Sequence, residues 1–377
     1  MPGVVGIIGL GAVGSMTALE LARRGRRVVG FDRFRPPHGF GSSHGKTRII
    51  REAYFEHPQY VPLVQRAYQR WVALEESGAA PLYLPTGGLM IGLPDGALVA
   101  GARRSAAEHG LEYQVLSAAE VGRRFPMFHL AGGEVGLLEP RAGVLFPEAA
   151  VRTALTLANR AGARLHYDEP VGEWSPGPAI TVRTPGASYE VDHLVVAAGA
   201  WMATGLPRMP LPLAVTRQTL FWFDPQPSGR ADDFGPGRMP VFIWEWQPGR
   251  MFYGFPDLGD GVKVAIHHEG EPADPMLERR AAAPGDAAPL LEALAGRIPL
   301  IGSVRESAVC LYTNTRSGDF LLDRHPADPR VILASPCSGH GFKFAPALGE
   351  VIADLVEERA PRFDLTPFRL ERFLRSA

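Results

Sequence analysis

The stretch VVGIIGLGAVGSMTALELARRG, residues 4–25, predicts a strand, a tight turn and a helix in direct succession. Its apolar start is typical of a buried strand, and Gly9, Gly11 and Gly14 then match the pattern G-x-G-x-x-G. Glycines at these places allow the turn, let a pyrophosphate approach the backbone and bring the helix close to the strand, while the helix N-terminus faces the phosphates. We therefore expect a dinucleotide to contact Gly9, Gly11, Ala12, Val13 and Gly14.

A second predicted strand follows this helix and ends in an acid. The sequence RRVVGFD ends at Asp32, where a carboxylate can accept hydrogen bonds from a ribose, and Arg33 comes directly after it. The glycine pattern alone is a weak signal, but a strand, a helix and a terminal acid at the right spacing favour dinucleotide binding over a purely structural turn. The pattern does not distinguish FAD from NAD.

Length and composition indicate an ordinary globular chain of one large or two interleaved domains. It has 377 residues, of which 46% are apolar and 21% charged, with a formal net charge of −1. A near-neutral charge argues against a nucleic-acid partner. No apolar run approaches the ~18 residues of a membrane span. The N-terminus lacks the features of a signal peptide, and two cysteines cannot form a disulfide framework, so we expect a cytoplasmic protein.

Three further segments bear on the choice of cofactor. Residues 189–201, YEVDHLVVAAGAW, predict a buried strand that runs into an Ala-Gly-Ala turn, a form found in many flavoproteins. Residues 39–54, GFGSSHGKTRIIREAY, form a polar loop with two arginines among glycines and serines, for which a solvated basic loop is the alternative. Residues 335–346, SPCSGHGFKFAP, place polar and flexible residues where a predicted strand meets a predicted helix. A ligand on that turn would explain them.

Several motifs in the same order resemble those of the monomeric sarcosine oxidase and N-methyltryptophan oxidase family, within the wider D-amino-acid-oxidase-like flavoproteins. They are GSSHGKTRIIR (41–51), YGFP (253–256), CLYTNT (310–315), DRHP (323–326) and SGHGFK (338–343). The resemblance covers nearly the whole chain. It implies a covalently bound FAD, oxidation of N-methyl or other secondary amino acids by O2, and a monomer. Lys46 departs from the resemblance, because neutral or acidic neighbours are expected in that loop.

The expected fold class is α/β, with a Rossmann-like FAD-binding domain of the glutathione-reductase type interleaved with a mixed-sheet α+β substrate domain. The FAD-binding domain is expected to comprise residues 1–80, 145–215 and 318–377, and the substrate domain residues 81–144 and 216–317. Within the latter, PVFIWEW and MFYGFP predict a hairpin with the four-residue loop QPGR.

The stretch GVKVAIHH, residues 261–268, alternates as a half-buried strand does. Val262, Val264 and Ile266 are expected to face the domain core, which leaves Lys263 and His267 on a polar face. On pattern alone Lys263 is a solvated lysine; the resemblance implies that it lies above the flavin. There a fixed cation stabilises the charge that develops when O2 is reduced.

The resemblance assigns further roles. Cys310, on its own a small apolar residue of the core, is the expected covalent link to FAD, whereas Cys337 is interpreted as a packing residue. Arg51 and Lys343 are expected to bind the substrate carboxylate, the alternative for Arg51 being an ion pair with an acid of the protein. Expected beside the flavin are His44, Thr47 and Arg48, for which loop-fixing hydrogen bonds are the alternative.

Other residues complete the predicted site. The remaining substrate contacts are expected from Tyr253, His267, Tyr312, His340 and Ile243, and either histidine can equally be a structural one. The remaining cofactor contacts are expected from Arg33, Ser42, Ser43, Ala198, Gly199, Trp201, Gly339, Gly341, Phe342 and Lys343. No metal is predicted, because no His, Cys, Asp or Glu cluster has ligand spacing.

The expected reaction is oxidative demethylation of sarcosine or a related small secondary amino acid with O2, giving formaldehyde, the amino acid and H2O2. Bulky Trp244, Trp246 and Tyr253 are expected to crowd the far wall and favour a small substrate. The alternatives are an N-methyltryptophan oxidase, an oxidase of cyclic imino acids such as proline or pipecolate, and an NAD(P)-dependent dehydrogenase.

Overall fold

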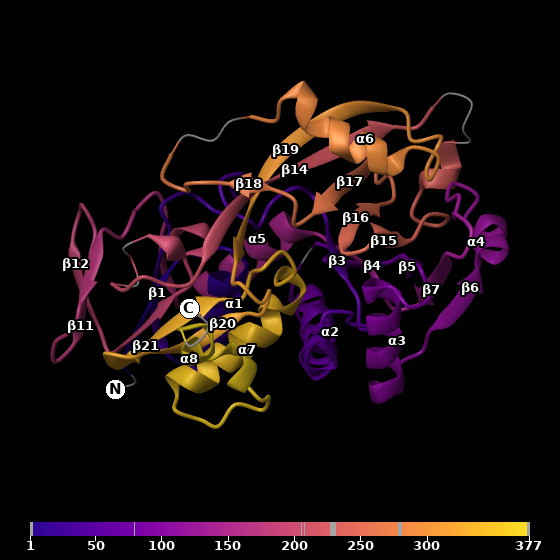
Figure 1. Cartoon of the computed structure of the whole chain (residues 1–377). Helices are drawn as coiled ribbons and strands as arrows, with labels where there is room; N and C mark the ends of the chain where they lie inside the picture. The colour runs from indigo at the N-terminus through magenta and orange to yellow at the C-terminus, as the bar shows by residue number, and fades with distance from the viewer. Residues whose placement is uncertain are drawn as a thin grey trace.

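A six-stranded sheet carries the N-terminal turn in the computed structural model, which describes residues 3–78, 80–204, 206, 208–226, 231–277 and 281–374. The strand order is β20-β21-β13-β1-β2-β9, and all neighbours are parallel except β20 and β21. The bounds are β1 Val4–Ile8, β2 Arg27–Phe31, β9 Arg164–His166, β13 His193–Val196, β20 Leu321–His325 and β21 Asp328–Ser335. The strand, turn and helix predicted from residues 4–25 are thus present at the centre of this sheet (Figure 1).

Helices cover one face of this sheet and a small sheet covers the other. The helices are α1 Ala12–Arg23, α2 Val61–Ser77, α5 Pro147–Arg160 and α7 Ala345–Val356, and their apolar sides form one core with β1 and β21. On the opposite face lies the three-stranded sheet of β10 Glu173–Ser175, β11 Ile180–Arg183 and β12 Ser188–Val191. The short helix α8, Leu370–Leu374, packs beside β20.

A larger mixed sheet forms the other half of the molecule. Its strands run in the order β18-β14-β17-β16-β15-β5-β7-β6, and β19 pairs along the whole of β14. The bounds are β5 Gly88–Gly92, β6 Gln114–Ser117, β7 Val135–Glu139, β14 Ala214–Asp224, β15 Val241–Gln247, β16 Arg250–Phe255, β17 Val262–His267, β18 Glu271–Pro272 and β19 Ser303–Asn314. The helices on this side are α3 Ala97–His109, α4 Ala118–Arg124 and α6 Ala288–Leu294.

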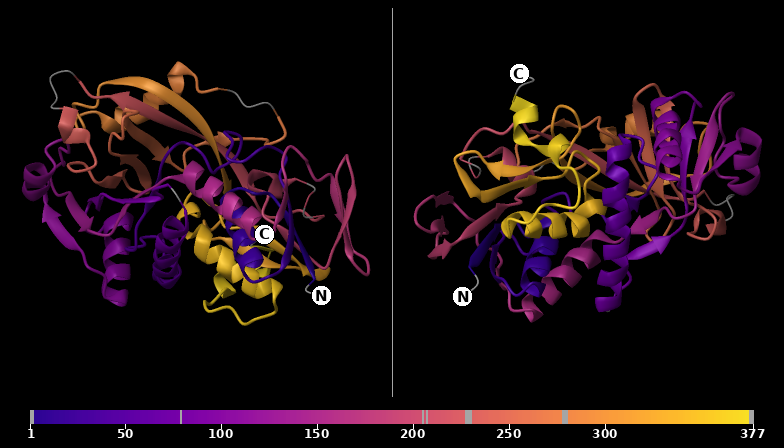
Figure 2. Two further views of the ribbon diagram at one scale, coloured as in Figure 1. Left: turned by 180° about the vertical axis from the view of Figure 1, so that it is seen from behind. Right: turned by 90° about the horizontal axis from the view of Figure 1, so that it is seen from below.

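The two sheets take their strands from alternating parts of the chain, which confirms the predicted fold class. The residue boundaries of the two domains stay a prediction. Figure 2 shows the same division from behind and from below, with α7 on the side of the six-stranded sheet. A further sheet has three strands in the order β3 Arg48–Ile50, β8 Gly143–Leu145 and β4 Tyr83–Pro85. Along the chain, these strands lie where the sequence passes from one of the two larger sheets to the other. Strand β3 belongs to the polar 39–54 segment, so this sheet connects that segment to the rest of the fold. No helix among the described residues is long and apolar enough to cross a membrane.

Two local predictions are corrected by the structure. The strand expected over residues 189–201 is broken at Asp192, whose carboxylate accepts a hydrogen bond from the Val4 amide at 2.6 Å, so that β12 and β13 belong to different sheets. The hairpin of β15 and β16 pairs Gln247 with Arg250, which leaves a two-residue loop instead of four. Gly249 in that loop has a φ of 73°, a conformation that glycine adopts without strain.

Candidate active site

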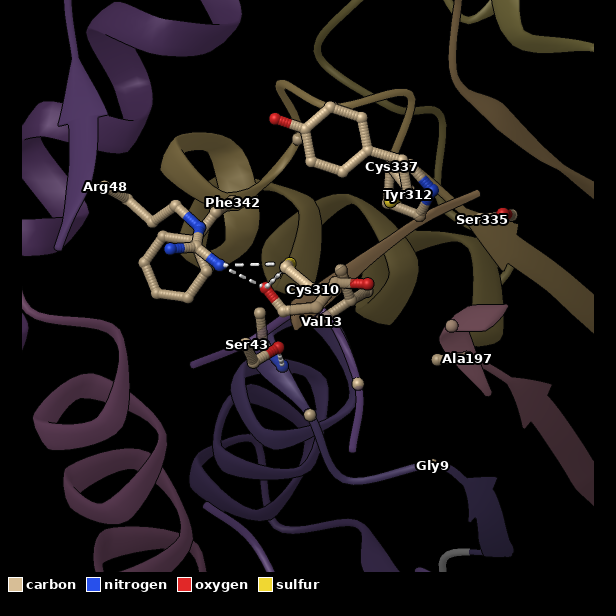
Figure 3. A pocket seen from close by; sticks show the side chains of 18 of the residues that line it. Gly9, Val13, Ser43, Arg48, Ala197, Cys310, Tyr312, Ser335, Cys337 and Phe342 are labelled. Atoms are coloured by element: carbon tan, nitrogen blue, oxygen red, sulfur yellow. Dashed lines mark hydrogen bonds between the residues drawn. The ribbon is translucent and has the colours of Figure 1, made fainter. Parts of the chain in front are cut away.

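One elongated cavity extends from the β1–α1 turn to the strands β16 and β17 of the large sheet. Its walls come from segments far apart in the sequence, including residues 41–56, the start of the short 3-10 helix Gly199–Ala203 after β13, β19 and the turn that precedes α7. Figure 3 shows Gly9 and Val13 on one side of this cavity and Tyr312, Cys337 and Phe342 on another. Most of the predicted site residues therefore line a single space.

The glycines of the first turn leave room that other residues would fill. Gly9 has a φ of 91° and, with Gly11, Ala12 and Val13, lines the cavity. Gly14 does not line it, because it faces the turn itself: a Cβ on Gly14 would lie 1.8 Å from the Gly9 carbonyl oxygen. Gly14 thus allows the close packing of helix on strand.

The end of β2 supplies the acid at this part of the cavity. The Asp32 carboxylate accepts hydrogen bonds from the Leu10 amide at 2.8 Å and the Phe34 amide at 3.0 Å, and the side chain is 7% exposed. The Arg33 guanidinium lies 5.8 Å from the centre of the Trp201 ring. Asp32, Arg33 and Trp201 line the cavity, together with the predicted contacts Ala198 and Gly199.

Glycines also shape the turn before α7. A Cβ on Gly341 would lie 1.7 Å from the Pro336 carbonyl oxygen, and one on Gly339, where φ is 74°, would lie 2.5 Å from the Tyr312 ring. The turn therefore fits only because both residues lack side chains, and it lines the cavity together with Phe342 and Lys343.

Arg48 and Cys310 meet in the middle of the cavity (Figure 3). The Arg48 guanidinium donates to the Thr47 carbonyl at 2.7 Å and the Ser42 carbonyl at 2.6 Å, and one of its nitrogens lies 3.7 Å from Cys310 Sγ. Ser43 Oγ accepts from the amide of Ala12 at 3.1 Å, which joins this loop to the start of α1. Cys337, the other cysteine of the cavity, accepts a hydrogen bond from the Thr313 amide at 3.4 Å.

Lys263 lies behind the cavity wall. It is 1% exposed, and its Nζ donates to the Gly45 carbonyl at 2.6 Å, the Thr47 carbonyl at 3.0 Å and Thr47 Oγ1 at 3.1 Å. Burial, and next the positive charge of Arg48, lower the pKa of Lys263 well below that of an exposed lysine. Thr47 and His44 are buried and do not line the cavity, and Thr47 Oγ1 accepts from Lys263; the roles of both residues stay predictions.

Arg51 and Lys343 line another part of the cavity, where Arg51 has an acidic partner. One Arg51 nitrogen donates to both oxygens of Glu56, at 2.7 and 2.6 Å, and the guanidinium lies 4.2 Å from the centre of the Tyr54 ring. Burial opposes ionisation of Glu56, but the charges of Arg51, His340 and Lys343 and the hydrogen bond from Arg51 together lower the pKa of that carboxyl. The ion pair that was the alternative for Arg51 is therefore present in this structure.

The ammonium group of Lys343 has fewer close hydrogen-bond acceptors than that of Lys263. Its Nζ donates to the His340 carbonyl at 2.8 Å and lies 3.4 Å from the Tyr54 hydroxyl. Burial, and next the charge of Arg51, lower the pKa of Lys343 to about 7. A carboxylate between Arg51 and Lys343 would therefore meet one permanent cation and one that gains a proton near neutrality.

His340 has partners on both ring nitrogens. Nε2 lies 2.9 Å from the Gly318 carbonyl, which can only accept, so Nε2 carries the proton and Nδ1 accepts from the Tyr54 hydroxyl at 2.6 Å. Burial lowers the pKa of His340 to about 4, which keeps the ring neutral. His340 is thus an oriented, hydrogen-bonded histidine that also lines the cavity.

Aromatic side chains line the substrate-domain wall. The hydroxyls of Tyr253 and Tyr312 lie 3.5 Å apart, and Tyr312 lies 3.5 Å from His267 Nδ1. Burial raises the pKa of both phenols and lowers that of His267, so all three groups are neutral. Ile243 lines the same wall.

The prediction that Trp244 and Trp246 crowd the wall is wrong. Both belong to the apolar core on the other face of the large sheet, where Trp244 Nε1 donates to Glu134 at 2.9 Å. Side chains alternate along a strand, so Ile243 faces the cavity and its neighbour Trp244 faces away. The expected burial of Val262 and Val264 in that core is confirmed.

Sequence reasoning missed three residues, Tyr54, Phe55 and Glu56, which lie three to five positions after Arg51. Tyr54 orients His340, while Phe55 and Glu56 line the cavity. The available signal was the sequence REAYFE, in which two acids and two aromatics follow an arginine already assigned to the site. Among the described residues, no group of three or more His, Cys, Asp or Glu side chains is arranged to hold a metal ion.

Comparisons with known proteins agree with this geometry. A family profile described as FAD dependent oxidoreductase matches residues 5–355. The chain is 40% identical to a monomeric sarcosine oxidase of Streptomyces avermitilis, over 93% of this chain and 92% of that protein. It is 36% identical to an N-methyl-L-tryptophan oxidase of Salmonella heidelberg, over 97% and 98% of the two chains.

Solved structures share the fold at lower identity. A glycine oxidase from Geobacillus kaustophilus superposes with a TM-score of 0.81 at 21% identity, covering 98% of both chains. An L-proline dehydrogenase from P. horikoshii superposes with a TM-score of 0.84 at 20% identity, covering all of this chain and 98% of the other.

This chain therefore belongs to the family of FAD dependent oxidoreductases. The residues present fit that cofactor: Gly9 and Gly11 leave the backbone accessible at the start of α1, and Asp32 lies at the end of the adjacent strand. Gly339 and Gly341 bring a second backbone segment to the same cavity without side chains. A dinucleotide would be held by Gly9, Gly11, Ala12, Val13, Asp32, Arg33, Ser42, Ser43, Ala198, Gly199 and Trp201.

Proposed function

We propose that this protein is an oxidase of sarcosine or a related small N-methyl or secondary amino acid. With an N-methyl substrate it consumes O2 and water and gives formaldehyde, the demethylated amino acid and H2O2. FAD, when bound, accepts two electrons from the amine and passes them to O2. The observation that carries the proposal is the pair of buried basic side chains, Arg51 and Lys343, in the cavity of the FAD family fold. The names of the two curated relatives support an N-methyl amino acid as the substrate class.

Arg51 and Lys343 bind the substrate carboxylate. An arginine presents a planar fork that matches a carboxylate, and a lysine adds a point charge. Arg51 already donates hydrogen bonds to the Glu56 carboxylate, so a substrate carboxylate must either share the Arg51 guanidinium with Glu56 or displace Glu56 from it. An amine without a carboxylate lacks this interaction and would bind weakly.

The cationic site also favours the neutral form of the substrate amine. A secondary ammonium with a pKa of about 10 loses its proton near pH 8 at a cost of roughly 3 kcal/mol. Arg51 is buried, Arg48 is half-buried and both are charged, so they disfavour a further cation in the cavity and supply part of this cost. Glu56 is a weak proton acceptor, because Arg51 lowers its pKa, and the proton leaves with solvent.

Two further roles belong to the proposal. Cys310 Sγ is the covalent attachment point of FAD, and the Arg48 charge 3.7 Å away stabilises its thiolate. In such a link the Cys310 thiol would replace one hydrogen of a flavin methyl group, and the two electrons and two protons released would be taken up by O2. Lys263, fixed by three oxygen acceptors, is the cation that assists the reduction of O2.

A peroxide assay tests the substrate class. We expect H2O2 from sarcosine, N-methylalanine, proline or pipecolate, and none from dimethylamine. Dimethylamine turnover equal to that of sarcosine would contradict the carboxylate contact, and a strong preference for N-methyltryptophan would select the larger-substrate alternative.

Acid precipitation of the purified protein tests the covalent link. Yellow colour is expected to stay with the precipitate of the wild type and of Cys337→Ser, and to move into the supernatant for Cys310→Ser. Acid-stable colour in Cys310→Ser would remove Cys310 from this role.

A further inference from the structure

Two glutamates, the half-buried Glu148 and the buried Glu139, hold the loop that carries Arg48 and Arg51 of the candidate active site. Residues 45–53 run antiparallel to residues 139–148, and β3 pairs with β8 at the centre, Arg48 opposite Leu145 and Ile50 opposite Gly143. Beyond each end of this short ladder, the backbone amides of the 45–53 segment donate hydrogen bonds to a glutamate side chain instead of to a backbone carbonyl. This glutamate is Glu148 at the start of the 45–53 segment and Glu139 at its end.

Glu148, in the first turn of α5, holds the turn that fixes Lys263. Its Oε1 accepts from the amides of Gly45 at 2.8 Å and Lys46 at 3.0 Å. The carbonyl of the same Gly45 accepts from Lys263 Nζ at 2.6 Å. The orientation of this turn therefore depends on an acid from the six-stranded side, while Lys263 comes from the large sheet.

Glu139, the last residue of β7, holds the turn that follows Arg51. Its two oxygens accept from the amides of Glu52 at 2.6 Å and Ala53 at 2.8 Å, and the side chain is 1% exposed. The carbonyl of the same Ala53 accepts from the Arg51 guanidinium at 3.1 Å. Displacement of this turn would displace Arg51 and with it the site for a carboxylate.

We propose that Glu148 and Glu139 are positioning residues for different halves of the reaction, Glu148 for the reoxidation step through Lys263 and Glu139 for substrate binding through Arg51. The inference rests on the proposed function, because it takes the roles of Lys263 and Arg51 from it. Neither glutamate lines the cavity, so neither acts as a catalytic residue.

The two sites differ in a way that substitutions can detect. One oxygen of Glu148 accepts both amides, so the single carbonyl oxygen of a glutamine can accept both as well. Glu139 uses one oxygen for each amide, so a glutamine there must turn its NH2 group toward an N–H donor and lose a hydrogen bond. Glutamine should therefore be tolerated at 148 but not at 139.

Glu148 also acts on Lys263 through its charge. The groups that face Lys263 are Arg48 and Lys46, which lower its pKa, and Cys310 and Glu148, which raise it. Glu148→Gln keeps the hydrogen bonds but removes a negative charge, so Lys263 should lose its proton at a lower pH. We expect the fall of the reoxidation rate with rising pH to move to lower pH in this variant.

The experiment separates the two half-reactions in stopped flow with the holoenzyme. Glu148→Ala should slow reoxidation of the reduced enzyme by O2 on the order of tenfold, the effect of a lost charged hydrogen bond. It should leave unchanged the Kd of methoxyacetate, a small carboxylate without an amine that serves as the probe of the carboxylate site. Glu139→Gln should weaken methoxyacetate by a similar factor and leave reoxidation unchanged. Glu245→Gln is the matched control, because this buried carboxylate also accepts from two backbone amides, of Leu98 and Gly249.

A second readout is independent of activity. Amide hydrogen exchange should become faster at residues 45 and 46 in Glu148→Ala, and at residues 52 and 53 in Glu139→Gln, with no such change at either place in the control. Equal losses in both half-reactions for both variants would mean general destabilisation and overturn the inference.

The outcomes also distinguish this inference from the proposed function. Normal reoxidation in Glu148→Ala, with slow reoxidation in Lys263→Met, overturns the role of Glu148 and leaves that of Lys263 intact. Normal reoxidation in both variants overturns the role of Lys263, and the Glu148 half of the inference fails with it.

Discussion

Two buried lysines of this protein, Lys263 and Lys343, differ in how many of their ammonium N–H groups donate hydrogen bonds to protein atoms. Lys263 Nζ has three oxygen acceptors within 3.1 Å, all from the turn at 45–47. Lys343 Nζ has one close acceptor, the His340 carbonyl at 2.8 Å, and a long contact of 3.4 Å to the Tyr54 hydroxyl. Burial lowers the pKa of both, but only Lys343 lines the cavity.

This difference separates a fixed charge from a binding group. An ammonium group has three N–H donors, and those of Lys263 all have protein partners, so its position is set before any ligand arrives. Lys343 has donor capacity left in the cavity, and a carboxylate can supply the missing acceptor. We therefore expect substitutions of the two lysines to affect different steps.

The largest effect is expected for Lys263→Met. Loss of a preorganised charge should slow reoxidation of the reduced enzyme by roughly 100- to 1,000-fold. Reduction by substrate should change much less, because Lys263 lies behind the cavity wall. Stopped-flow absorbance of both half-reactions measures this, and unchanged reoxidation would show that the charge has no such role.

Lys343→Met provides the reciprocal test. Loss of one charged hydrogen bond, worth about 1.5 to 3 kcal/mol, should weaken methoxyacetate by roughly 10- to 150-fold. Reoxidation should be preserved. Equilibrium titration of the flavin spectrum gives the Kd, and a variant that binds methoxyacetate like the wild type would exclude Lys343 from the carboxylate site.

The pH dependence of inhibitor binding sharpens the comparison. Lys343, with a pKa of about 7, is charged below that pH and loses its proton above it. The Kd of methoxyacetate, which has no amine to titrate, should therefore rise above pH 7 by up to about tenfold per pH unit, because the bound carboxylate holds the proton on Lys343. Lys343→Met should lack this slope, and a wild-type Kd that falls with rising pH has the wrong sign.

The smallest effect is expected for Tyr54→Phe. The change removes the hydroxyl 2.6 Å from His340 Nδ1 and 3.4 Å from Lys343 Nζ. Loss of a neutral hydrogen bond costs about 0.5 to 1.5 kcal/mol, which corresponds to a roughly 2- to 12-fold weaker methoxyacetate complex. Reoxidation serves as the internal control here, since Tyr54 has no contact with the Lys263 turn among those described. A loss as large as that of Lys343→Met would mean that Tyr54 itself binds the carboxylate.

Much of the predicted site was recognised from short motifs. GSSHGKTRIIR contains Arg48 and Arg51, and SGHGFK contains His340 and Lys343; the structure brings all four into one cavity. The motifs did not reveal that Arg51 has Glu56 as a partner or that Lys263 is held behind the wall. Their roles in catalysis stay predictions.

The error at Trp244 and Trp246 has a simple physical origin. Alternation along β15 shows that neighbours face opposite sides, but it does not state which side meets the cavity. For Trp244 that choice depends on its packing against Phe128 and Phe252 on the far face of the sheet. If the assignment of faces along β15 is shifted by one residue, the side chains that line the cavity and those that face the apolar core are exchanged.

By itself, the sequence determined the β1–turn–α1 unit and the placing of Asp32 after β2, because these depend on steric and hydrogen-bonding rules that act between near neighbours. Only the tertiary structure decided that Glu139 and Glu148 hold the 45–53 segment, about 90 to 100 residues away along the chain. A carboxylate that accepts backbone amides leaves no periodic pattern in either segment. Which carboxylate accepts from these amides depends on which strands pack side by side, and that packing depends on how the whole chain buries its apolar side chains.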